Sequence, residues 1–276
     1  MQLSCPVCQA ELLGDNRQLR CAQGHSFDAA RQGYFNLLLV QRKRSRDPGD
    51  NPDMVQARRQ FLCRQHYQPL SDAINQLSHT LLSEATDPKI LDVGCGEGYY
   101  TARLREHLLT LGHTPDMAGL DISKHAIKAA TQRSRDIQWL VASAAEMPLP
   151  AYQLDLALLL FSRILPAPLA QVLKPGGQLL IAWPGQDHLR QLRERIYTEV
   201  HDTVLDVAGL LEPHFSQSEI KTVRYDFTLT GADAIGELLA MTPHGQRLKN
   251  EARERILNLS SLTLTLDVNL GVFQRV

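Results

Sequence analysis

The sequence lacks an excess of charge of either sign, a long apolar run and a basic leader. Lysine and arginine total 29 and aspartate and glutamate total 30, so the net charge of -1 excludes a globally basic nucleic-acid binder but leaves room for a local basic patch. No run approaches the roughly 18 uninterrupted apolar residues of a membrane-spanning helix, and no basic flank precedes an apolar core at the N-terminus. We therefore expect a cytoplasmic protein with no membrane partner.

Cysteine is scarce, with five residues in 276, but four potential metal ligands are placed systematically. Cys5-Pro-Val-Cys8 and Cys21-Ala-Gln-Gly-His25 are separated by about a dozen residues, which is the ligand spacing of structural zinc sites. Four protein ligands complete a tetrahedron, so one zinc ion is expected to fold this segment without taking part in chemistry. A redox role for the first pair would need a thioredoxin-like βαβ context. Disulfides are not expected in a reducing compartment.

Glycine is concentrated in the stretch 90–100, where a short apolar run ends in Asp92 and glycines follow at every second position. This order predicts a strand, a tight loop and a helix start, which together can bind a polar or anionic ligand. The strict alternation differs from the Gly-x-Gly-x-x-Gly fingerprint of dinucleotide sites. A second acid closes the next apolar strand, where a carboxylate can accept both hydroxyls of a ribose. The candidate cofactor-binding residues from this pattern are Asp92, Gly94, Gly96 and Asp121.

Strand-like and helix-like segments alternate through the middle of the chain. The expected strands are 89–93, 117–121, 138–142, 154–161 and 178–182, and the expected helices are 101–109, 124–133 and 167–173. Such alternation gives right-handed crossovers and a parallel sheet that binds ligands at the carboxyl ends of its strands. Further strands are expected at 221–229 and 262–272, and a further helix at 232–241. The predicted fold class is α/β, a Rossmann-like sheet with a small N-terminal zinc-binding module.

The region between the zinc ligands and the glycine-rich stretch begins with two segments of different composition. Residues 33–40 suit a short strand or docking segment, and 41–52 form a basic cluster that runs into turn formers. That cluster is either a solvated linker or a loop that contacts the phosphates of an RNA. The candidate RNA-binding residues are Arg42, Lys43, Arg44 and Arg46.

Helical spacing follows from residue 53 to residue 82, with a break at Tyr67-Gln68-Pro69. Tyr67 lies in this break, where its ring could cover a bound ligand or simply pack in the core. The predicted units are therefore a zinc-binding module at 1–40, a basic linker with a helical segment at 41–84, and a cofactor-binding domain at 85–276.

The glycine-rich stretch resembles motif I of the class I S-adenosylmethionine-dependent methyltransferases, and nearly the whole chain resembles the 23S rRNA guanine-N(1) methyltransferase family. The stretches that carry the family resemblance are 5–8 with Cys21 and His25, 27–38, 43–50, 57–62, 66–70, 92–100, 173–177 and 184–189.

This resemblance implies a seven-stranded methyltransferase core and methylation of N1 of a hairpin or loop guanine in 23S rRNA. It also implies zinc on Cys5, Cys8, Cys21 and His25, and an RNA cleft shared across a homodimer. The cofactor contacts that it implies are Tyr67, Gly96, Glu97 and His188.

One segment departs from the family pattern. Where family members are expected to continue Arg-Ile-Tyr after the fourth strand, this chain has Arg163-Ile164-Leu165. No general base for the guanine proton is identifiable from the sequence. Two alternatives stay open: a small-molecule methyltransferase with a structural zinc module, and a non-catalytic zinc nucleic-acid-binding protein. RNA binding should weaken steeply with salt, whereas binding of a small acceptor should not.

Overall fold

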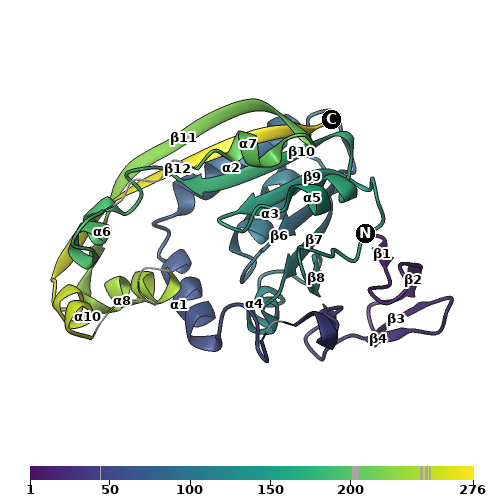
Figure 1. The fold of residues 1–276 in the computed structure, drawn as a ribbon, viewed down its shortest axis with the longest axis horizontal. Coiled ribbons are helices and arrows are strands. Elements are labelled where there is room, and N and C mark those ends of the chain that lie inside the picture. The colour runs from purple at the N-terminus through teal and green to yellow at the C-terminus, as the bar shows by residue number, and fades with distance from the viewer. Residues whose placement is uncertain (44, 201–204, 243–244, 246–247, 249) are drawn as a thin grey trace.

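The computed structural model describes residues 1–276 except 44, 201–204, 243–244, 246–247 and 249. The described strands form two sheets, one of four strands and one of eight. In Figure 1 the smaller sheet, drawn in purple, lies at one end of the molecule, and the C-terminal helices drawn in yellow-green lie at the other. The larger sheet runs between them.

The four-stranded sheet is built from the N-terminal segment alone. Its antiparallel strands, in spatial order, are β1 (Leu3–Ser4), β2 (Glu11–Gly14), β3 (Gln18–Cys21) and β4 (Ser26–Asp28). Leu3, Leu12 and Leu19 are buried, and they join the same apolar cluster as strands of the larger sheet. The backbone N–H of Ser4 also donates to the carbonyl of Pro148 at 2.9 Å. The module is thus packed against the rest of the chain.

The eight-stranded sheet carries the cofactor-type loop. Its strands are β5 (Phe35–Asn36), β6 (Lys89–Val93), β7 (Asp116–Asp121), β8 (Gln138–Val141), β9 (Leu154–Leu160), β10 (Leu173–Pro184), β11 (Phe215–Thr230) and β12 (Ser261–Arg275). The spatial order is β11-β12-β10-β9-β6-β7-β8-β5, in which β12 is antiparallel to both of its neighbours and the other pairs are parallel. The order of the connections reverses at β6, which is where a doubly wound sheet binds its ligand.

The strand or docking segment predicted at 33–40 is confirmed. Phe35 pairs with Leu140 and Asn36 with Val141, so β5 extends the parallel sheet beyond β8. The N-terminal segment therefore contributes to both sheets.

Helices cover the sheet and frame its ligand-binding edge. Their bounds are α1 (Pro52–Cys63), α2 (Gln68–Leu81), α3 (Tyr99–Thr110), α4 (Lys124–Ala130), α5 (Pro166–Val172), α6 (Arg190–Ile196), α7 (Val207–Leu211), α8 (Gly231–Met241) and α10 (Asn250–Leu257), with a 3-10 turn at Val40–Arg42. The Asn51 side chain caps α1 by accepting from the N–H of Met54 at 2.9 Å, and Pro52 occupies the first turn, where its missing N–H costs nothing. None of the described helices has the length and apolar content needed to span a bilayer.

Most elements in the middle of the chain lie where the periodicity predicts them. The break at Tyr67 separates α1 from α2 as expected, and the leucine and isoleucine stripe of α2 is buried at Leu70 and Ile74 and half-buried towards the end of the helix. Two differences concern the C-terminal half: β11 begins at Phe215 and β12 ends at Arg275, so both strands are longer than predicted. The first half of β11 is solvent-exposed, and its polar side chains hide the alternation that marks a half-buried strand.

Candidate functional site

The four predicted zinc ligands converge on one point. Their ligand atoms all lie within 4.8 Å of one another, with Cys8 Sγ at 3.7 Å from Cys21 Sγ, and His25 Nδ1 at 3.3 Å from Cys21 Sγ and 3.6 Å from Cys5 Sγ. A tetrahedron with Zn–S bonds of about 2.3 Å and a Zn–N bond of about 2.0 Å has edges of roughly 3.5 to 3.8 Å. The donor set and its spacing fit a structural zinc ion with no open coordination position.

Local hydrogen bonds shape both zinc-binding turns. The N–H of Gln9 donates to the carbonyl of Cys5, and the N–H of Gly24 donates to that of Cys21, so each ligand pair sits on a tight turn. Burial would raise the pKa of the Cys21 thiol, but hydrogen bonds from the backbone and from Cys8 and His25 lower that pKa to about 6. A thiol that loses its proton readily is prepared to act as a thiolate ligand.

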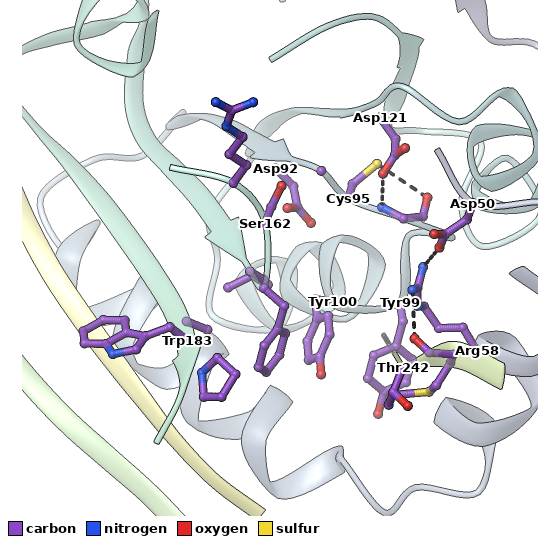
Figure 2. A pocket seen from close by; sticks show the side chains of 18 of the residues that line it. Asp50, Arg58, Asp92, Cys95, Tyr99, Tyr100, Asp121, Ser162, Trp183 and Thr242 are labelled. Atoms are coloured by element: carbon purple, nitrogen blue, oxygen red, sulfur yellow. Dashed lines mark hydrogen bonds and ion pairs between the residues drawn. The ribbon is translucent and has the colours of Figure 1, made fainter. Parts of the chain in front are cut away.

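A cavity of about 1020 Å³ opens at the carboxyl ends of β6, β7, β9 and β10. Among the residues that line it, Asp92 and Asp121 come from β6 and β7 beside the glycine loop. Phe161 directly follows β9, Trp183 lies on β10, and His188 lies in the segment after β10. Figure 2 shows the labelled Asp50, Arg58 and Asp121 on one side and Trp183 on the other. The volume suits a small-molecule cofactor together with part of a second ligand.

The glycine loop is shaped by contacts that only glycine allows. Gly94 has a φ of +80°, and a Cβ there would lie 2.4 Å from Ser162 Oγ, so any side chain would collide with the loop after β9. Gly96 has a φ of +56°, and the nearest atom to its would-be Cβ is Arg58 Nη1 at 3.7 Å. The loop thus packs closely at Gly94 and leaves space for a ligand at Gly96.

Asp92 lies near the carboxyl end of β6, lines the cavity and is 1% exposed. Its Oδ2 accepts a hydrogen bond from Thr101 Oγ1 at 2.6 Å, whereas its Oδ1 has no partner within the described part of the chain. Burial raises the pKa of this carboxyl to about 7, against the opposing hydrogen bond of Thr101 and with a smaller contribution from the charge of Asp121. A buried acceptor that lines the cavity without a partner fits a ligand that brings a donor or a positive charge.

Asp121 closes β7 and is held by the backbone on both sides. Its Oδ2 accepts from the N–H of Gly96 at 3.0 Å, and its Oδ1 accepts from the N–H of Ser123 at 2.7 Å. Burial raises the pKa of this carboxyl, although these two hydrogen bonds oppose the shift. The carboxylate is therefore fixed beside the glycine loop, where its remaining lone pairs can accept from the hydroxyls of a ribose.

The three remaining predicted cofactor residues also line the cavity. Glu97 is buried and receives two hydrogen bonds from Arg133, at 2.8 and 3.0 Å. Tyr67 is 4% exposed, and its ring lies 6.4 Å from that of His188 in an edge-on arrangement. His188 precedes α6 in the loop after β10. The structure brings all seven predicted cofactor residues to one cavity.

The basic cluster is docked beside this cavity through its acidic residues. Asp47 pairs with His125 Nε2 at 2.8 Å, the carbonyl of Asp50 accepts from Ser123 Oγ at 2.6 Å, and the Asp50 carboxylate pairs with Arg58. Of the predicted RNA contacts, Arg42 pairs with the exposed Glu146 at 2.9 Å, Arg46 is exposed and Lys43 is half-buried. Arg44 lies outside the described residues.

Asp50 and Arg58 line the cavity but were not predicted as site residues, whereas Phe161 ends the fourth predicted strand, which was expected to border a ligand pocket. Asp50 and Arg58 link the basic cluster, α1 and the carbonyl of Met241, and Phe161 follows β9 with a φ of 55°. Only Phe161 could be located from the sequence, because it ends a predicted strand and the ligand-side residues of a parallel sheet lie at or just after the ends of its strands. The Asp50–Arg58 pair joins segments whose proximity depends on tertiary structure.

Two family models match separate parts of the chain. Residues 3–46 match a zinc-ribbon model described as "RlmA, N-terminal", and residues 90–177 match a model described as "Methyltransferase domain". Together with the glycine loop and the four-ligand cluster, these matches define a Rossmann-like S-adenosylmethionine-dependent methyltransferase with a zinc-binding module.

Relatives that align over nearly the whole chain identify the family within this class. The 23S rRNA (guanine(748)-N(1))-methyltransferase of Streptomyces fradiae is 33% identical over 277 residues, covering 98% of this chain and 95% of the relative. YxjB of Bacillus subtilis (strain 168), provisionally named a 23S rRNA (guanine-N(1)-)-methyltransferase, is 30% identical over 279 residues, covering 96% and 94%. The chain belongs to the 23S rRNA (guanine-N(1))-methyltransferase family. Among solved structures, geranyl diphosphate C-methyltransferase of Streptomyces coelicolor A3(2) aligns with a TM-score of 0.45 at 14% identity, covering 74% of this chain and 76% of that one.

Proposed function

We propose that this enzyme methylates N1 of a hairpin or loop guanine in 23S rRNA. The observation that carries the proposal is similarity over nearly the full length, zinc module included, to relatives named for N1 methylation of guanine in 23S rRNA. A small-molecule methyltransferase would need only the cofactor domain. The cytoplasm, whose reducing conditions keep cysteine thiols available as zinc ligands, is the proposed location.

The proposed cofactor site consists of residues that the cavity already brings together. Bound S-adenosylmethionine supplies an electrophilic methyl group on its sulfonium. We assign Asp121 to the ribose hydroxyls, because both of its oxygens are fixed by backbone N–H groups beside Gly96. The unpartnered Oδ1 of Asp92 is assigned to a donor on the methionine part of the cofactor. The other proposed contacts are Tyr67, Gly94, Gly96, Glu97 and His188.

The protein's contribution to the reaction is chiefly positioning. A rigid site that aligns the guanine nitrogen with the methyl group converts an encounter of two molecules into a local step. Neutral guanine carries a proton on N1 that must leave during transfer, and no side chain is assigned as its acceptor. The target base must also leave its stack to enter the cavity, at a cost of about a few kcal/mol.

RNA phosphates are proposed to bind the basic cluster through Arg42, Lys43, Arg44 and Arg46. The pairing of Asp47 with His125 and of Asp50 with Arg58 fastens this cluster to the cavity wall. A phosphate bound there would hold the RNA next to the cofactor. We also propose a homodimer that shares the RNA cleft; sedimentation of the enzyme as a monomer at assay concentrations would contradict this part.

The direct test is transfer of a labelled methyl group from S-adenosylmethionine to unmethylated 23S rRNA, followed by digestion to nucleosides. Labelled 1-methylguanosine is the expected product. A matched reaction with Asp121→Ala at low cofactor concentration should lose most of the label. Cofactor binding without incorporation into rRNA would overturn the assignment and favour a small-molecule acceptor or a non-catalytic RNA-binding role.

A further inference from the structure

Phe161 is an aromatic residue placed at the centre of the ligand edge of the sheet, yet it is 41% exposed. It directly follows β9, which lies between β6 and β10, and it lines the large cavity. Buried aromatic residues stabilise a core, and Phe161 is not one of them. An exposed phenyl face that opens into a binding cavity offers a flat apolar surface to a ligand instead.

The backbone holds Phe161 in a conformation that phenylalanine rarely adopts. Its φ is 55°, in the left-handed region that favours glycine, and its N–H donates to the carbonyl of Ala182 at 2.9 Å. Such a conformation persists only where the surroundings impose it, and it is frequent at binding sites. The hydrogen bond to β10 therefore fixes the direction in which the side chain leaves the strand.

The position of this loop places its ligand next to the cofactor. Ser162 Oγ lies against Gly94 of the cofactor loop, and Figure 2 shows Ser162 beside Asp92. The phenyl ring itself is nearly parallel to the imidazole of His188, with an interplanar angle of 27° and centroids 6.3 Å apart. Phe161 thus shares the cavity with the glycine loop and His188, where a second ligand beside the proposed cofactor could contact its ring.

The chemistry around Phe161 fits a nucleotide. Trp183, Ile164 and the half-exposed Leu210 also line the cavity and add apolar surface to its wall. Arg163, two residues further on, is exposed and has no ion pair with any residue that the structure describes. An apolar platform for a base beside a free cation for its phosphate is the arrangement that recognises unstacked nucleotides.

We infer that the ring of Phe161 is the platform on which the target guanine stacks after it leaves the RNA, with Arg163 holding an adjacent phosphate. This inference rests on the proposed function. In this loop Leu165 replaces the tyrosine of the family pattern. Phe161, at the end of β9, would supply an aromatic ring in its stead. Phe161 acts by positioning the base and takes no part in moving a proton.

The test compares Phe161→Leu with Phe161→Tyr in the full-length enzyme. Leucine keeps an apolar side chain but removes the aromatic face, whereas tyrosine keeps that face. Methyl transfer to unmethylated 23S rRNA is measured at saturating S-adenosylmethionine, with cofactor affinity measured by calorimetry and folding by thermal denaturation. Phe161→Leu should lower kcat/KM for RNA roughly 10- to 100-fold and Phe161→Tyr less than about threefold. Cofactor affinity and melting temperature should be unchanged in both.

Full activity of Phe161→Leu would overturn the inference while leaving the proposed function intact. An equal loss in the leucine and tyrosine variants would also overturn it, because a stacking role must be rescued by a second aromatic ring. Failure of the wild-type enzyme to form 1-methylguanosine would instead refute the proposed function, and the stacking role with it. The wild-type reaction in the same assay separates these cases.

Discussion

Asp92 and Asp121 are two buried carboxylates in one cavity, and their hydrogen bonds differ. The backbone fixes both oxygens of Asp121, whereas Asp92 has one partner, Thr101, and one oxygen without any among the described residues. The fold therefore determines the geometry of Asp121 almost completely. Asp92 instead has one oxygen that faces the cavity and is available to a ligand.

The raised pKa of Asp92 predicts a pH-dependent stability of the cofactor-free protein. Folded Asp92 keeps its proton up to about pH 7, while the unfolded chain releases it near the ordinary value of about 3.9. The folded state binds more protons in this window, so the free energy of unfolding falls as pH rises from about 4 to 7, by at most about 4 kcal/mol. Asp92→Asn should lack this fall. The melting temperature of the variant minus that of the wild type should therefore increase as pH rises from about 5 to 8. Parallel melting profiles would show that Asp92 is ionised throughout.

Replacing Asp121 tests the proposed ribose contact. Asp121→Ala should weaken cofactor binding by about 1.5 to 3 kcal/mol, the usual contribution of hydrogen bonds to a charged group. Titration calorimetry measures the loss, and Asp116→Ala, at the opposite end of β7, serves as the control. Wild-type affinity of the Asp121 variant would remove this residue from the site.

The sequence predicted those site residues that belong to a local pattern. Gly94, Gly96 and Asp121 stand at fixed positions relative to strand ends, and all three line the cavity. Arg58 was missed because it reaches the cavity only when α1 packs beside α8 and Asp50. Such residues carry no local signal, since tertiary contacts alone bring them to the ligand.

At the scale of elements, the parallel strands were predictable because burial on both faces leaves continuous apolar runs. Strands β6 and β9 begin where the apolar periodicity places them. The helix α10 was missed, because its sequence is charged and only Ile256 is buried. The proposed division into 1–40, 41–84 and 85–276 stays a prediction, and β5 joins the sheet of the third unit from within the first.

The zinc-binding turns predict a selective effect of Cys8→Ala. Loss of one ligand should release zinc and destabilise the four-stranded module, because its own apolar core is small. Cofactor affinity should survive in part, since the cavity is lined by residues from other elements. Metal analysis and calorimetry measure the two effects, and Cys63→Ala, an exposed cysteine outside the cluster, is the matched control. Unchanged zinc content in Cys8→Ala would refute the ligand assignment.

At the scale of the whole molecule, the balance of charge makes RNA binding a local property. With a net charge of -1, the protein cannot attract RNA through its overall field. The attraction must come from clusters such as the one fastened beside the cavity by Asp47 and Asp50. RNA affinity should therefore depend on few phosphate contacts.

Salt titration of RNA binding tests this view. Affinity for 23S rRNA should fall steeply between about 50 and 200 mM salt through release of counterions. Arg46→Ala should weaken binding and reduce the slope of log affinity against log salt by about one, without changing cofactor affinity. Arg253→Ala, an exposed arginine on α10, is the control and should leave the slope unchanged. If Arg46→Ala leaves the slope unchanged, the basic cluster at 41–52 is a linker and does not bind RNA phosphates.

The short strand β5 has a consequence for how this protein can be divided. Because Phe35 and Asn36 hydrogen-bond to β8, a chain that starts after them would present the bare backbone of β8 to solvent. An unprotected strand edge is a template for pairing with other chains. A catalytic fragment cut at the predicted boundary should therefore aggregate, whereas one that begins before residue 33 should stay dispersed. Residues 33–40 are in this sense part of the larger sheet, although they directly follow the zinc module, and recombination between family members would have to exchange this segment and the sheet together.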